Sequence, residues 1–230
     1  MKKKLLFPTE LCYLLGMVLL ALSAQLHVLA DFGVSPIVAI PYLLSVKLEP
    51  LCSFFTFGMT QYVYQTFLLL VMIVLLRRFR LSYLFSFFSA FLFGLIVDGV
   101  GLLLGLLPTP DLAMRIVYFI LGLFIAAAGV ALTFKTYITP EVFEMFVMEL
   151  APHFKVDIHK FKIGYDWTNC LVALILSFTF FGMWHFVGVS WGTVVTSLIN
   201  GWIIARCSKL FEKCFCYKDV LPLRKFFENI

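Results

Sequence analysis

Long apolar stretches dominate this 230-residue sequence and constrain its fold more than any other feature. The hydrocarbon core of a bilayer is about 30 Å thick, so a helix needs about 20 apolar residues to cross it. Hydrophobic residues make up 62% of the chain and charged residues only 13%, an apolar excess that soluble domains do not show. The alternating segments of an outer-membrane barrel are missing. The sequence therefore predicts an all-α, polytopic membrane bundle of six transmembrane helices, in the stretches 11–30, 57–76, 81–106, 116–134, 168–187 and 190–207.

The basic residues predict how these helices are oriented. If the N-terminus is inside, all 18 lysines and arginines except Lys47 and Arg115 fall on the inner side. Cytoplasmic loops retain basic residues, so we expect a multi-pass protein with its N- and C-termini in the cytoplasm. Anionic lipid headgroups are the expected partners of this charge. Nucleic acid is not, because the basic residues flank the spans and form no continuous surface with aromatic residues.

Two segments between the spans resemble each other. Ser35-Pro36 precedes one apolar segment and Thr139-Pro140 precedes another. A Ser or Thr N-cap followed by Pro at the first helical position is a helix-start signal. Each half is therefore expected to carry a short extra helix, at about 35–46 and about 139–154, and the spacing of apolar and acidic residues makes the second one amphipathic.

The order of these elements predicts an internal repeat. Three spans per half is an odd number, so the second half must enter the membrane upside down relative to the first. The sequence thus predicts a 3+3 inverted repeat, with halves 1–110 and 111–213 followed by a cytoplasmic tail, 214–230. Weak similarities within the halves agree, since Gly94 pairs with Gly201 and Ser86 with Thr193. Inverted repeats with interrupted helices are the usual construction of secondary transporters.

Three motifs carry a family resemblance. They are the stretch from Gly16 through ADFGVSP, the segment FGLIVD, and the closing VGVSWGTVVTSLINGWII. Over about residues 12–210 the chain resembles the YczE/YyaS/YitT family of bacterial integral membrane proteins. The resemblance implies a protein of the bacterial plasma (inner) membrane that is transporter-like and has no defined substrate. The first half departs from the pattern, because LSYLFSFFSA stands where a pair like Gly192-Thr193 is expected.

Asp98 is the sharpest single feature, because no other charged residue lies within a dozen positions of it. An ionised carboxylate inside a membrane is costly, so this one should face protein or water. Gly94, Gly101 and Gly105 lie on the same helical stripe, which lets a neighbouring backbone approach closely. Asp98 either couples a proton or cation to movement of the repeats, or is a structural carboxyl bonded to neighbouring hydroxyls or amides.

Other polar residues are expected in the outer half of the bundle. Gln25 and His27 lie late in the first span, Asp31 follows it, and Gln61 and Gln65 share one face of the second span. Together they could coordinate a small polar or cationic solute, with His27 able to change charge near neutral pH. The alternative is that the glutamines hold helices together and that Asp31 only ends a helix.

The second half offers three further candidates. Asp166 and Asn169 stand one turn apart at the inner start of the fifth span, where Asp166 could equally be a helix cap. In the sixth span Asn200 lies on a polar face beside Gly201, and it is the residue there that needs an external partner.

No catalytic, nucleotide-binding or metal-binding motif occurs in the sequence. We therefore expect no enzyme activity, no cofactor and no metal. The leading hypothesis is a secondary transporter or channel-like permease that binds a small solute or ion at Asp98 with His27 or the Gln61/Gln65 face. The alternative is a membrane regulator or maturation factor that docks a protein through the 139–154 helix and the tail. A homo-oligomer or another membrane-protein partner is left open.

Overall fold

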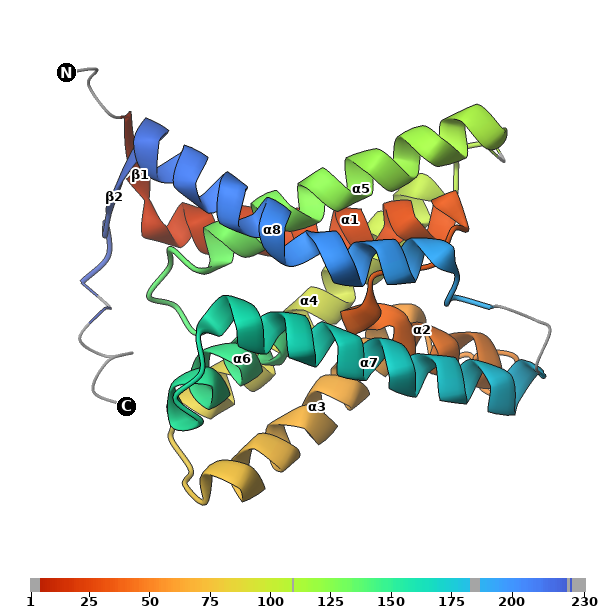
Figure 1. Ribbon diagram of the computed structural model, residues 1–230, viewed down its shortest axis with the longest axis horizontal. Coiled ribbons are helices and arrows are strands. Elements are labelled where there is room, and N and C mark those ends of the chain that lie inside the picture. The colour runs from red at the N-terminus through yellow and green to blue at the C-terminus, as the bar shows by residue number, and fades with distance from the viewer. Residues whose placement is uncertain (1–4, 109, 183–186, 223, 225–230) are drawn as a thin grey trace.

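The fold is a helical bundle with short strands near the two ends of the chain (Figure 1). The computed structural model describes residues 5–108, 110–182, 187–222 and 224. The part of the predicted tail at 223 and 225–230 lies outside this range. In chain order the elements are β1 (Leu5–Pro8), α1 (Thr9–Ala30), α2 (Pro36–Leu48), α3 (Phe57–Leu76), α4 (Ser82–Leu104), α5 (Leu112–Thr133), α6 (Val142–His153), α7 (Ile158–Phe181), α8 (Trp191–Cys214) and β2 (Phe215–Lys218).

Five helices are long and apolar enough to cross a membrane: α1, α3, α4, α5 and α7. The prediction of a helical membrane protein is therefore confirmed in this coarser form. The predicted sixth span is not, because α8 is not among these five helices: Thr193, Thr196 and Asn200 lower the hydropathy of its uncharged part. Helix α7 also begins earlier than predicted, at Ile158 and not near residue 168, so its first turns include charged residues.

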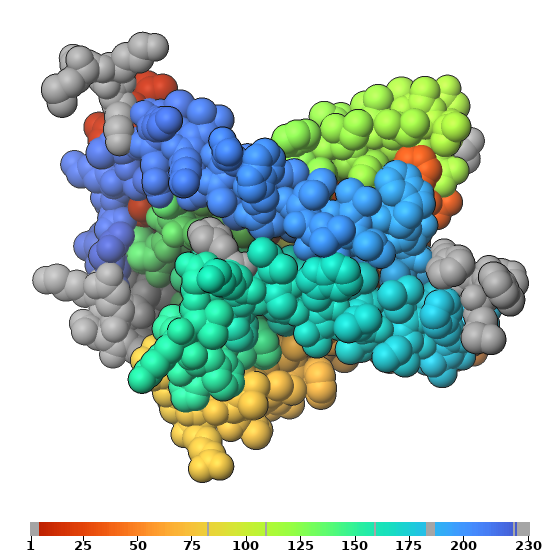
Figure 2. Space-filling view, in the orientation of Figure 1, coloured from red at the N-terminus to blue at the C-terminus, as the bar shows by residue number. Residues whose placement is uncertain are grey.

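The helix contacts come in matching pairs when the first four helices are compared with the last four. Helix α1 packs on α5, and each also packs on the last helix of its own half, α4 or α8. Helix α2 contacts α7, and α6 contacts α3. In the same way α3 packs on α4 and α7 on α8, the pair that lies side by side in Figure 2. Each short helix thus packs against a long helix of the other half.

Small residues allow the close contact between α1 and α5. A Cβ added at Gly16 would lie 2.6 Å from the Thr133 hydroxyl and 3.2 Å from the carbonyl oxygen of Gly129. A Cβ added at Gly122 would lie 2.8 Å from the ring of His27. Backbone approach at small residues is a usual basis of helix association in membranes, where the hydrophobic effect between helices is weak.

The prediction of an amphipathic interfacial helix at 139–154 is half right. A short helix is present as α6, but both of its faces are buried, including Glu141 and Glu144 on the side expected to face solvent. Of the three acids only Glu149 is partly exposed, in ion pairs with Arg78 and Arg80, and the last two residues of α6 are exposed. Because α3 and α7 cover this helix, its apolar side is not a free docking surface.

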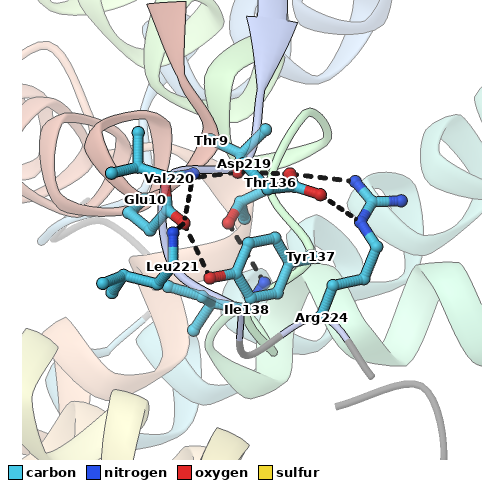
Figure 3. A network of polar contacts seen from close by, with 9 residues as sticks. All are labelled: Thr9, Glu10, Thr136, Tyr137, Ile138, Asp219, Val220, Leu221 and Arg224. Carbon is cyan, nitrogen blue, oxygen red and sulfur yellow. Dashed lines mark hydrogen bonds and ion pairs between the residues drawn. The ribbon is translucent and has the colours of Figure 1, made fainter. Parts of the chain in front are cut away.

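A polar network joins the two ends of the chain (Figure 3). Strands β1 and β2 pair in parallel, with Leu5 opposite Phe215. Beside them the Glu10 carboxylate accepts hydrogen bonds from the Tyr137 hydroxyl and the Leu221 N–H, both at 2.8 Å. Burial and this hydrogen bond raise the pKa of the Tyr137 phenol to about 12, so it remains a donor. The network therefore ties the tail to the loop that leads into α6.

A second set of contacts in the same network, centred on Asp219, also holds the tail to the start of α1. The Thr9 hydroxyl donates to the Asp219 carboxylate at 2.7 Å, and Asp219 also pairs with Arg224. These bonds lower the pKa of the Asp219 carboxyl and keep it ionised. The guanidinium of Arg224 in turn lies 5.6 Å from the centre of the Tyr137 ring.

We predict that Glu10→Ala releases the tail. The variant removes the acceptor for two backbone N–H groups of the tail, so strand β2 should open more often. Because proteolysis follows the population of open forms, trypsin cleavage after Lys218 should accelerate about three- to tenfold, as expected for charge-assisted hydrogen bonds near the surface. The control is Glu49→Ala at the distant end of α2. Equal cleavage rates in the two variants would contradict the role of Glu10.

Candidate functional site

The first turns of the short helices α2 and α6 line one small internal cavity of about 40 Å³. Helices α1, α4 and α5 supply the rest of its wall. Its polar lining consists of Ser23, Ser35, Glu141 and Glu144. Figure 1 shows α6 on the side of the chain termini and α2 on the opposite side, so the two short helices lead away from this point in different directions.

Glu141 is held in place by Gln65 of α3. The Gln65 amide nitrogen donates to Glu141 Oε2 at 3.0 Å, and its amide oxygen accepts from the Val142 N–H at 2.8 Å. The first free N–H of α6 is thus capped by a side chain of another helix. The prediction that Gln65 holds helices together fits this geometry. It does not face His27 or Asp98.

Hydroxyl groups of α4 explain why α6 begins later than predicted. Ser86 donates to the carbonyl oxygen of Pro140 at 2.7 Å, and Ser89 donates to that of Thr139 at 3.0 Å. The chain is therefore extended at Thr139-Pro140, and α6 starts at Val142 with Glu141 as its N-cap. The expectation that Thr139 caps a helix beginning at Pro140 is wrong for this reason.

The start of α2 has a similar support from α8. The Thr193 hydroxyl donates to the carbonyl oxygen of Val34 at 2.8 Å. Ser86 and Thr193, which match in the sequence, thus each bond the segment that leads into a short helix. Helix α2 begins at Pro36 as predicted, but the Ser35 hydroxyl makes no capping bond, contrary to expectation.

Helix α7 adds a buried ion pair beside the cavity. Lys162 Nζ lies 3.2 Å from Asp166 Oδ1, and both side chains are at most 6% exposed. The prediction that Asp166 lies at a helix start is wrong, because α7 begins two turns earlier. Asn169, one turn further on, accepts from the Tyr64 hydroxyl at 2.8 Å. The two predicted residues are therefore part of this buried cluster.

The cluster contains more negative than positive charge. Glu141, Glu144 and Asp166 are buried, and Lys162 is the buried cation among the described residues. Each ionised carboxylate in a dry interior costs several kcal/mol unless it is paired. The α6 N-terminus returns about 0.3–2 kcal/mol, which is too little for two extra charges. The arrangement can therefore bind protons or a cation.

Asp98 occupies a different place in the fold. Its carboxylate accepts from the Gly58 N–H at 2.8 Å and from the Thr56 hydroxyl at 2.6 Å, at the start of α3. Thr56 itself caps α3 by accepting from the Met59 N–H. This geometry matches the structural alternative for Asp98, a carboxyl bonded to a neighbouring hydroxyl and amide.

The glycine stripe of α4 contacts two different helices. Gly94 faces the backbone of Gly58, and a Cβ at Gly94 would lie 2.6 Å from the Gly58 oxygen. Gly101 lies against Gln25, whose amide donates to the carbonyl oxygen of Val97. Gly105 only ends α4. The stripe thus serves packing, and Gly58 is a contact residue that the sequence did not single out.

His27 and Asp31 lie away from the other candidates. His27 is buried between α1 and α5, with Nδ1 2.8 Å from the Ser23 carbonyl oxygen and its ring against Phe119. Asp31 ends α1 in a left-handed conformation and pairs with Arg115 at 2.8 Å. The structure therefore does not gather Asp98, His27 and the Gln61/Gln65 face into one site.

Four predicted residues have buried polar atoms without a hydrogen-bond partner among the described residues. They are His27 at Nε2, Gln61 at both amide atoms, Asp166 at Oδ1 and Asn200 at Oδ1. Gly201 is buried next to Asn200 and approaches Ile163 of α7, in line with its predicted packing role. Such buried, unpaired groups mark places where a ligand, a water or another conformation supplies the missing bond.

Sequence reasoning did not identify Glu141, Glu144 and Lys162 as site residues. The acids follow a helix-start signal and alternate with apolar residues, which is also the pattern of an interfacial helix. A usable signal was their position in the short segment that repeats Ser35-Pro36. Within the described part of the chain no group of three His, Cys, Asp or Glu is placed to hold a metal ion.

Comparison with known proteins gives one match. A family model described as a family of unknown function (DUF6198) matches residues 7–209 of the chain. No curated protein and no solved structure matches it. The more specific likeness to the YczE/YyaS/YitT family is not confirmed by this match.

We predict that Gly58→Ala destabilises the contact between α3 and α4. The new methyl group would collide with the Gly94 carbonyl oxygen and lie 2.6 Å from Asp98 Oδ2. Overpacking of this kind costs about 1–3 kcal/mol, which corresponds to a loss of about 2–12 °C in the unfolding midpoint of a chain of this size. Gly99→Ala is the control, since a methyl group there meets nothing within 4 Å. Similar midpoints for both variants in detergent would refute the close contact.

Proposed function

This chain belongs to the DUF6198 family of unknown function, and we propose that it is a secondary transporter or permease for a small polar or ionic solute. The observation that carries the proposal is the meeting of two short helix N-termini at one small cavity, where Ser23, Ser35, Glu141 and Glu144 stand among apolar residues. Interrupted or short helices that end at the middle of a bundle are the usual binding elements of such transporters.

The helix contacts support an inverted repeat. Exchanging α1–α4 with α5–α8 maps each of the major contacts onto another, and the α1–α5 contact onto itself. We propose that α8 completes the second half as a sixth span, because Trp191 to Ala205 contains no charged residue. With three spans in each half, the halves then have opposite orientations in the membrane.

The distribution of charge supports an orientation with both termini in the cytoplasm of a bacterial cell. Lys135 pairs with Glu212, and both Arg78 and Arg80 pair with Glu149. These residues lie on loops or helix ends at the end of the bundle where β1 and β2 also lie (Figure 1). Arg115 pairs with Asp31 at the opposite end of α1. Basic residues thus concentrate at one end of the bundle, as the positive-inside rule requires.

The small cavity corresponds to an occluded conformation in this proposal. Access from each side would require the half that carries α2 or the half that carries α6 to move relative to the other. Hydroxyl bonds of Ser86 and Thr193 hold the segment before α6 to α4 and the segment before α2 to α8, so each short helix is tied to the opposite half and must move with that half or break the bond. The α1–α5 contact lies between the moving parts.

A substrate-free experiment tests alternating access. Ser35→Cys, in a chain whose six cysteines are replaced by serine, places a thiol in the cavity wall. We predict that a small, charged, membrane-impermeant thiol reagent labels it from both sides, in right-side-out and in inside-out vesicles. A transporter exposes its site to each side in turn, so both preparations should react.

Ala39→Cys serves as the matched control for this experiment. Ala39 is on the same short helix and fully buried, but it does not line the cavity. It should stay unlabelled in both preparations. Labelling of Ser35→Cys from one side only, or labelling as slow as that of Ala39→Cys, would contradict a transport function.

A further inference from the structure

We infer that the central cavity binds one small monovalent cation, such as Na⁺, in competition with protons on Glu141 and Glu144. This inference deepens the proposed function by naming the ion that the site takes. It rests on the proposed function only for its place in transport, because binding itself can be measured without any flux.

The charges in the cluster favour such a ligand. Lys162 and Asp166 form a pair, which leaves Glu141 and Glu144 as excess buried carboxylates. Glu141 receives a hydrogen bond from Gln65, but Glu144 Oε2 has no hydrogen-bond partner among the described residues although the side chain is 97% buried. A buried carboxylate oxygen without a donor requires either a proton of its own or a cation beside it.

The donor atoms around the cavity are hard oxygens. The Ser23 hydroxyl donates its proton to the carbonyl oxygen of Gly122 at 2.8 Å and lies 3.3 Å from His27 Nδ1, which leaves one lone pair for a cation. The Ser35 hydroxyl makes no capping bond and also lines the cavity. Two carboxylates and two hydroxyls form an oxygen-rich set of the kind that hard cations prefer.

The size of the cavity restricts the occupant. A volume of about 40 Å³ has room for an ion with roughly one or two waters, and none for an organic solute. Ca²⁺ takes about 6–8 oxygen ligands, and Mg²⁺ keeps several of its waters. The cavity is too small to hold either ion with that many ligands or waters. One monovalent cation together with one proton balances the two excess charges.

Other titratable groups surround the two carboxylates. Those of α7 are Lys162, Tyr165 and Asp166, and those of α3 and α1 are Tyr64 and Tyr13, whose rings also lie near the cluster. The cavity-lining residues of α2, α4 and α5 carry no titratable group. On α1, His27 Nδ1 contacts both the hydroxyl and the carbonyl oxygen of Ser23, but His27 does not line the cavity. Exchange of a proton for a cation at this site therefore involves Glu141 and Glu144, with Lys162 as the partner of Asp166.

Equilibrium titration of the purified full-length protein tests the inference. NaCl is added in weak buffer at constant ionic strength, with choline chloride as the replaced salt, and a pH indicator records proton release. We expect release of about one proton per protein and a higher unfolding midpoint in NaCl than in choline chloride. Because one proton competes with one cation, the apparent Kd for Na⁺ should rise about tenfold for each unit by which the pH is lowered.

Variants on the same helix assign the effect. Glu144→Gln and Glu141→Gln should each abolish Na⁺-dependent proton release, whereas Glu149→Gln, at the surface of α6, should release protons like the unchanged protein. If Glu141→Gln does not fold, the result for Glu144→Gln tests the inference by itself. Folding of that variant is expected, because Glu144 Oε2 makes no hydrogen bond to another described residue that the substitution would break. Wild-type protein that responds equally to choline, Na⁺, Li⁺ and K⁺, or full proton release in Glu144→Gln, would overturn the inference.

The outcome is separable from that of the labelling experiment. Labelling of Ser35→Cys from both sides without cation-dependent proton release would keep the transporter and remove this ligand. Cation-dependent proton release with labelling from one side only would keep the binding site and remove the transport function.

Discussion

Helices α2 and α6 begin inside an apolar bundle, where no water reaches the free N–H and C=O groups at their ends. Each unpaired group there would cost several kcal/mol, so other helices must supply the partners. Gln65 of α3 does this for α6 by bonding both the Val142 N–H and the Glu141 carboxylate. Ser86 and Thr193 bond the carbonyl groups that precede α6 and α2. The position of the cavity, and of the acids that line it, follows from these few bonds.

Two kinds of intramembrane carboxylate are present, and their hydrogen bonds separate them. Asp98 stands alone in the sequence, but its two oxygens are bonded to Gly58 and Thr56 at the start of α3, where the helix dipole also favours a negative charge. Glu144 stands among other acids, and one of its oxygens has no hydrogen-bond partner in the described structure. The absence of other charged residues nearby in the sequence is therefore a poor guide to which buried carboxylate lacks hydrogen-bond donors in the fold.

Much of the fold could be predicted from the sequence because its signals are local. Hydropathy locates five of the long helices, and the Ser-Pro and Thr-Pro pairs locate the two short ones to within a few residues. The candidate site could not be predicted in the same way. The residues that hold the start of α6, Gln65 and Ser86, lie 76 and 54 residues from their partners in the sequence, and the alternation of acidic with apolar residues in α6 fits an interface as well as a core. Burial depends on these distant partners, which periodicity does not reveal.

The polar network at the chain ends bears on the same site. The Tyr137 hydroxyl donates to Glu10, and Tyr137 lies four residues before Glu141, which is bonded to Gln65. The loop between Tyr137 and Glu141 is therefore short and held at both ends. Movement of the α6 start must therefore break the Tyr137–Glu10 bond or carry Tyr137 and the tail with it. Glu10 also bonds the Leu221 N–H, so the first turn of α1, the loop before α6 and the tail are mechanically connected. A conformational change that opens the cavity along α6 is then coupled to how tightly the two ends of the chain are joined.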